Sequence, residues 1–78
     1  MKNSKKHTTW ESLPDFLTAQ QISEFLGISR RRVYELFQLH VNHGGIPVLQ
    51  IGTSKRVEKN DLKQWVIESK KKNQHMIN

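Results

Sequence analysis

Residues 17–34 have the sequence LTAQQISEFLGISRRRVY, and this stretch decides the fold. Thr18, followed three positions later by Gln21, forms the pattern of a capping box, in which each side chain bonds the backbone N–H of the other residue. Leu17 and Ile22 flank the box at the spacing of a hydrophobic staple. The pattern predicts a helix that begins at Thr18 or at the residue after it.

A second helix follows after a tight corner. Gly27 is suited to the left-handed position that ends a helix, and only one residue separates it from Ser29, a good N-cap. Apolar residues recur at i, i+3 and i+4 in both segments, as Ile22, Phe25 and Leu26 and then as Val33, Leu36 and Phe37. Two short amphipathic helices joined in this way predict a helix-turn-helix.

The chain after residue 39 changes character. Residues 40–45 form a predicted loop, and Pro47 forces the residue before it out of the helical region. Residues 48–51 and 56–58 have the pattern of two short strands around a turn at residues 52–55, which predicts a β-hairpin with a basic tip. In this context the hairpin is a wing.

A third helix is predicted to close the core. Its cap is Glu58 or Asn60, and its apolar residues are Leu62, Trp65 and Val66. Leu49 or Val48, together with Ile51 and Val57, adds the hairpin's share of the core. The predicted fold class is therefore α+β, a small winged helix-turn-helix of three helices with a two-stranded β-hairpin wing.

The length and net charge of the chain limit its possible functions. The 78 residues carry 13 Lys and Arg against 7 Asp and Glu, a net charge of +6, and no Cys. A chain of this size holds one small domain, and its positive charge suits a polyphosphate partner, so nucleic acid is the expected partner class. We expect an ordered domain over residues 10–68, a flexible basic tail over residues 1–9 and a flexible Lys-rich tail over residues 69–78.

The expected location is the cytoplasm. The basic start of the chain lacks the apolar run of a signal peptide, and no stretch is apolar for the roughly 18 residues that a membrane span needs. We expect no cofactor, no small-molecule substrate and no metal, since His40 and His43 have no Cys or nearby acidic residue to complete a zinc site. No catalytic set of residues can be assembled, so an enzyme is not expected.

The candidate DNA contacts fall into two groups. A basic first turn on the second helix of a helix-turn-helix faces the major groove, and a basic hairpin tip can enter the minor groove or meet its phosphates. The recognition-helix candidates are Ser29, Arg30, Arg31, Arg32 and Tyr34, and the wing candidates are Thr53, Ser54, Lys55 and Arg56. Three positive charges at a helix N-terminus oppose the helix dipole, which indicates that an external anion favours them.

Each candidate also has a structural interpretation. Ser29 caps a helix whether or not it meets a phosphate, and Tyr34 either bonds a phosphate or packs its ring at the edge of the core. Residues 70–72, three lysines, are either a solvated tail or a nonspecific contact to DNA or a partner. Trp10 and Trp65 are expected in or beside the core rather than as stacking platforms.

These landmarks together resemble the excisionase family of small winged-helix proteins. The resemblance spans residues 17–66 and is carried by LTAQQI, LGISRRRVY, IPVLQIG, the pair Arg56-Val57 and DLKQW. The linker over residues 38–45 is longer than is common in that family. The resemblance implies a MerR-like winged-helix fold and a protein that binds double-stranded DNA near the end of a mobile element, as several copies side by side, and bends it to promote excision by a separate integrase.

Two alternatives remain open. The same family includes small transcriptional regulators, which would use the same surface. A basic protein-interaction module, whose arginines and lysines bind an acidic partner, is the alternative from another class, and the salt dependence of DNA binding separates it from the other two.

Overall fold

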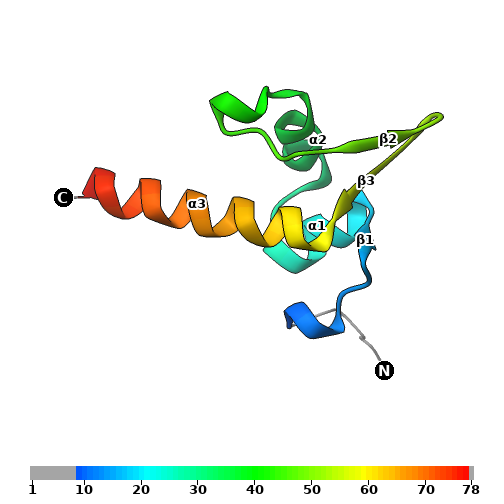
Figure 1. The fold of residues 1–78 in the computed structure, drawn as a ribbon, viewed down its shortest axis with the longest axis horizontal. Helices are drawn as coiled ribbons and strands as arrows, with labels where there is room; N and C mark the ends of the chain where they lie inside the picture. Colours follow the sequence, from blue (N-terminus) through cyan, green and yellow to red (C-terminus); the bar gives the residue numbers. More distant parts are fainter. Residues whose placement is uncertain (1–8, 78) are drawn as a thin grey trace.

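The structure is a computed structural model that describes the backbone of residues 9–77 and the side chains of residues 9–72. Its helices are α1 (Ala19–Leu26), α2 (Arg30–Gln38) and α3 (Lys59–Ile77), and its strands are β1 (Phe16–Leu17), β2 (Leu49–Ile51) and β3 (Ser54–Glu58). Two short 3-10 turns, η1 (Trp10–Ser12) and η2 (Val41–His43), complete the described part (Figure 1). The predicted α+β winged helix-turn-helix is confirmed.

The corner between α1 and α2 forms as the sequence predicts. The Gln21 backbone N–H donates to Thr18 Oγ1 at 3.1 Å, and the Thr18 N–H donates to Gln21 Oε1 at 2.9 Å. Gly27 ends α1 with φ +73°, and its N–H donates to the Ser23 carbonyl. Since only glycine adopts this left-handed conformation without steric cost, the chain turns within three residues into α2.

The sheet has three strands, one more than the predicted hairpin. Its order is β1-β3-β2, and both pairings are antiparallel. In the added pairing, Phe16 lies opposite Glu58 and Leu17 opposite Val57. A two-residue strand carries no periodic pattern of its own, so β1 forms only because folding brings it beside β3.

The core lies where α1, α2, α3 and the base of the sheet meet. The side chains with essentially no exposure are Leu17, Ile22, Ile46, Leu62, Val33 and Val57. Trp10 and Trp65 are half-buried against this cluster, which confirms their predicted packing role. The predicted burial of Ile51 is wrong, because it is 59% exposed on a hairpin that projects from the body (Figure 1). Leu49 is also exposed, whereas Val48 packs on the core.

Regular structure, including the N-cap residue of η1, extends past both ends of the predicted domain, residues 10–68. Helix α3 continues through Ile77, nine residues past the expected boundary at Glu68, so most of the Lys-rich segment is helical. At the other end, Thr9 caps η1 through Ser12, and the remainder of the expected N-terminal tail, residues 1–8, lies outside the described residues.

The long linker between α2 and β2 folds onto α3. It contains η2 rather than the irregular loop that was predicted, and His40 caps it by accepting the Asn42 N–H on Nδ1 at 3.1 Å. The Trp65 indole N–H of α3 donates to the Gly44 carbonyl at 2.9 Å. These bonds fix the linker, which in turn sets where the wing leaves the body.

Candidate nucleic-acid interface

The first turn of α2 carries the three predicted arginines, and the helix sends them in different directions. Successive residues on a helix point about 100° apart, so Arg30, Arg31 and Arg32 cannot share one face. Ser29 caps the helix: its Oγ accepts the Arg32 N–H at 3.1 Å. This bond confirms the structural interpretation of Ser29.

The wing consists of β2, β3 and the turn between them. Gly52 adopts φ +61° in that turn, and the Gln50 side-chain amide donates to its carbonyl at 3.0 Å. On β3 the Arg56 guanidinium bonds the carbonyl of Lys55 through Nη1 at 2.9 Å. Strand β3 therefore carries two cations at adjacent positions, Lys55 and Arg56.

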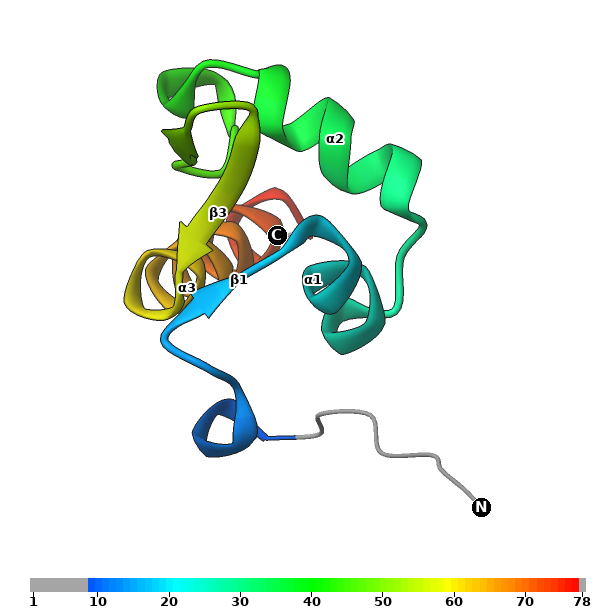
Figure 2. The ribbon, with the colours of Figure 1, turned by 90° about the vertical axis from the view of Figure 1, so that its right-hand side faces the viewer.

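A single concave surface joins α2 to the wing. This surface, here called the basic groove, has a volume of about 460 Å³ and is lined by Thr18, Ala19, Gln20, Arg30, Tyr34, Thr53, Ser54, Lys55 and Arg56. In Figure 2, α1, α2 and β3 lie on the near side of the molecule and α3 runs away from the viewer. The lining includes three cations and no carboxylate. Six of the nine predicted contact residues come together there.

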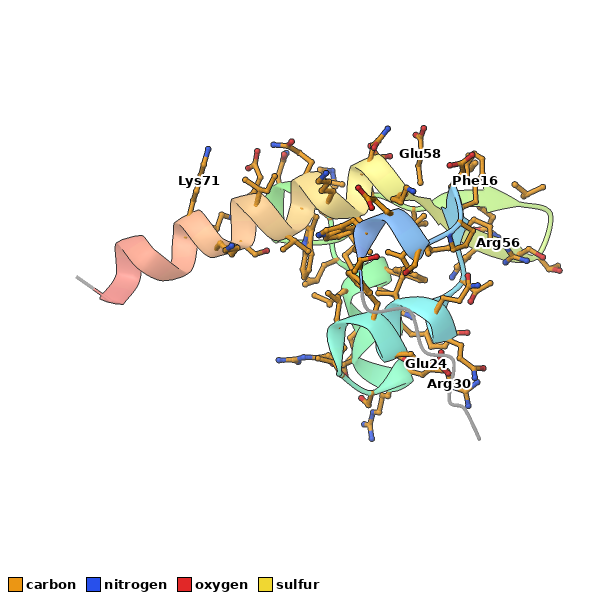
Figure 3. The ribbon with its side chains drawn as sticks, turned by 90° about the horizontal axis from the view of Figure 1, so that it is seen from below. Phe16, Glu24, Arg30, Arg56, Glu58 and Lys71 are labelled. Carbon is orange, nitrogen blue, oxygen red and sulfur yellow. The ribbon has the colours of Figure 1, made fainter. Side chains whose placement is uncertain are left out.

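Arg30 is the arginine that lines the basic groove. Figure 3 shows Arg30 and Arg56 at one end of the molecule and Lys71 of α3 at the opposite end. The chain thus places cations from α2 and from β3, 26 positions apart in sequence, on one surface. Because of the helix period, Arg30 lies beside the inner face of α2, where it lines one wall of the basic groove. The wing forms the other wall.

Arg31 and Arg32 lie outside the groove, beside Glu35. The Arg31 Nε is 3.8 Å from one Glu35 carboxylate oxygen, and Arg32 Nη1 donates to the other at 3.3 Å. Their side chains are 90% and 66% exposed. Neither is held against the body of the protein, so both remain accessible to a duplex.

Tyr34 packs its ring at the edge of the core, which is one of the two interpretations that the sequence left open. Its ring meets Phe37 edge-on, with the ring centroids 5.9 Å apart, and Phe37 belongs to the core. The residue is still 47% exposed and lines the basic groove one helical turn from Arg30. The ring is therefore anchored on one side and open on the other.

The start of α1 is the part of the groove that the sequence did not single out. Thr18, Ala19 and Gln20 all line the basic groove. The fold type could have indicated this role for α1, because the first helix of a helix-turn-helix crosses the DNA backbone. Helix N-termini also offer backbone N–H groups to anions.

The lysines of the C-terminal segment do not join this surface. Lys72 lines a second concave surface on α3, and Lys71 lies at the far end of the molecule from Arg30 (Figure 3). Over the described residues, no three His, Cys, Asp or Glu side chains group closely enough to hold a metal ion. None of the described helices has both the length and the apolar character of a membrane span.

Comparison with known proteins identifies the class. A family model described as "Helix-turn-helix domain" matches residues 16–70, which is more than half of the chain. No curated protein and no solved structure matches the chain. The chain belongs to this helix-turn-helix family, and its fold and family make it a double-stranded DNA-binding domain.

Proposed function

We propose that the protein binds double-stranded DNA at a specific sequence, with α2 in the major groove and the wing on the adjacent minor groove. The observation that carries the proposal is the basic groove, in which Arg30 and Tyr34 of α2 face Thr53 to Arg56 of the wing without any carboxylate among the lining residues. Phosphate contacts fix the register of a protein on a duplex, while side chains on the recognition helix read base edges.

Within this arrangement we assign the arginines to two kinds of contact, with phosphates and with a base. Arg30, Lys55 and Arg56 line the concave surface and suit the phosphates of a backbone that runs through it. Arg31, almost fully exposed on the outer side of α2, suits a bidentate contact to guanine O6 and N7. Phosphates then supply most of the affinity, and Arg31 supplies base preference.

We further propose that the DNA is bent and that the site lies near the end of a mobile element. The support is the resemblance of residues 17–66 to the excisionase family, in which several copies bind side by side and bias an integrase towards excision. Bending a site of 20–30 base pairs by 40–90° costs about 1–6 kcal/mol, which contacts along a wing and a helix can offset. The protein itself is not an enzyme in this proposal, because the integrase carries out strand exchange.

The test uses two DNA fragments. DNase footprints and circular-permutation gel shifts are run on the end of the element and on the region upstream of this protein's own gene. Excisionase function predicts protection and a bend at the element's end, and integrase added to a plasmid substrate then yields more excised product. Binding only upstream of the gene, without a bend, would instead support the transcriptional regulator.

A further inference from the structure

Glu35 is an acidic residue on a helix whose other charged residues are all arginines. It is the sole carboxylate in α2, it is exposed, and it lies one turn beyond the triple-arginine start. A negative charge on a surface that approaches phosphates weakens binding to every sequence. A role that compensates for this loss of affinity would explain why a carboxylate lies there.

The contacts of Glu35 indicate that role. One carboxylate oxygen accepts a hydrogen bond from Arg32 Nη1 at 3.3 Å, and the other lies 3.8 Å from Arg31 Nε. The carboxylate thus lies between two guanidinium groups, one at i−3 and one at i−4. In an exposed arginine the side chain otherwise samples many rotamers, and fixing them costs binding free energy.

The atom that Glu35 approaches on Arg31 matters. The carboxylate is nearest Nε, so the two terminal amino groups, which can donate in parallel to guanine O6 and N7, remain open. The side chain of Arg31 is 90% exposed, so little else in the protein restrains it. Glu35 is the group placed to set its direction.

We propose that Glu35 is a positioning residue that orients Arg31 to read a guanine in the major groove. This inference rests on the proposed function, because it names how the same surface discriminates among sequences. It predicts two opposite effects of removing the charge: weaker discrimination between sequences, and stronger binding to DNA of any sequence. A carboxylate that only offsets the nearby positive charge predicts the second effect without the first.

The experiment starts from a random-sequence duplex library. Sites are selected with the wild-type protein, and affinities for the selected site and for single-base variants of it are then measured for Glu35→Gln, Arg31→Ala and the double variant. Glu68→Gln is the matched control, because Glu68 also accepts an i−4 side-chain bond, from Gln64 at 3.1 Å, but lies on α3. Circular dichroism melting of each variant shows that it is folded under the binding conditions.

Arg31→Ala is expected to lower preference for one guanine by about 10-fold, within the range of a good bidentate contact. Glu35→Gln is expected to lower the same preference by about 5-fold while raising affinity for unrelated DNA by about 2-fold. The double variant should be no less selective than Arg31→Ala alone, because Glu35 acts through Arg31. Glu68→Gln should leave the preference unchanged.

Three results would overturn the inference. Unchanged preference in Glu35→Gln leaves Glu35 without a positioning role, and additive losses in the double variant mean that it contacts a base by itself. Failure of the wild-type protein to select any sequence would overturn the proposed function as well. The first two results leave the proposed function standing, so the two failures are distinguishable.

Discussion

Two of the concave surfaces on the described part of the protein differ in the charge of the residues that line them, and of these two the basic groove suits DNA. The basic groove is lined from α1, α2 and the wing, whereas a second surface, here called the α3 groove, lies between the linker after α2 and helix α3. The α3 groove has a volume of about 230 Å³ and is lined by Val41, Gly44, Gly45, Pro47, Asp61, Gln64, Trp65, Glu68, Ser69 and Lys72. It includes two carboxylates, and the basic groove includes none.

The two surfaces differ in the charge of their lining residues and in the elements that supply those residues. In the basic groove the cations come from a helix start and a hairpin, the two elements that fit the grooves of DNA. In the α3 groove, the Trp65 indole N–H donates to the Gly44 carbonyl, and the lining includes two carboxylates and one lysine. We therefore interpret the α3 groove as the join between the linker and the body, and the following predictions test that assignment.

The largest effect expected is the response to salt. If the basic groove binds a phosphate backbone through about four contacts, affinity for DNA falls by about 100-fold between 50 and 200 mM salt, because bound cations are displaced from the duplex on binding. Fluorescence anisotropy on a labelled duplex across this range measures the slope. A shallow slope, or no DNA binding, would favour the protein-interaction module.

The next effect concerns the α3 groove. Gly45→Ala adds a Cβ that collides with the backbone carbonyl of Leu39, so we expect the free energy of unfolding to fall by about 2 kcal/mol. Chemical denaturation measures it, with Gln64→Ala, an exposed change in the same groove, as the control. Gln64→Ala, which leaves the linker backbone in place, should bind DNA as the wild type does. A large loss of DNA affinity in Gln64→Ala would place the α3 groove in the interface.

Charge removal in each groove gives a matched pair. Arg30→Ala should weaken DNA binding by about 10-fold, in the range of a lost charge-assisted contact, whereas Lys72→Ala removes the same charge from the α3 groove and should change affinity by less than about 2-fold. Gel shifts with a common duplex compare the two variants directly. Equal losses would mean that net charge, rather than the basic groove, drives binding.

The smallest loss of overall affinity is expected from Lys55→Ala, and its comparison with Arg31→Ala separates phosphate contacts from base contacts. Lys55→Ala should weaken binding to all sequences alike, by about 5-fold, and lower the salt slope by about 1, because it loses a phosphate contact. Arg31→Ala should instead relax preference at a single base position by about 1–3 kcal/mol. Competition among single-base variants of a selected site separates these patterns. If both variants bind as the wild type does, the docking arrangement is wrong.

Local signals in the sequence predicted the central part of the fold well. Thr18 and Gln21 predicted the capping box, Gly27 predicted the left-handed corner, and both are confirmed. These features depend on residues within a few positions of each other, so the sequence contains everything that they need. The same reasoning predicted the wing hairpin and the third helix, although not the length of that helix.

Features that depend on distant contacts were predicted poorly. Strand β1 exists because β3 lies beside it, and Ile46 is buried because the linker folds back over α2 and α3. Ile51 has the same apolar character, yet it is exposed because the hairpin extends beyond the body. Hydrophobicity alone does not distinguish such positions, since burial depends on what packs against them.

For the candidate site, the amino-acid sequence determined which residues carry positive charge and which helix presents them, because capping and periodicity are local. The tertiary structure decided which of them meet. It placed Arg30 across from Lys55 and Arg56, and it left Arg31 and Arg32 on the outer side beside Glu35. The physical reason is that the direction of a side chain follows from the helix period, whereas its distant neighbours follow from how α2 and the wing pack on a shared core.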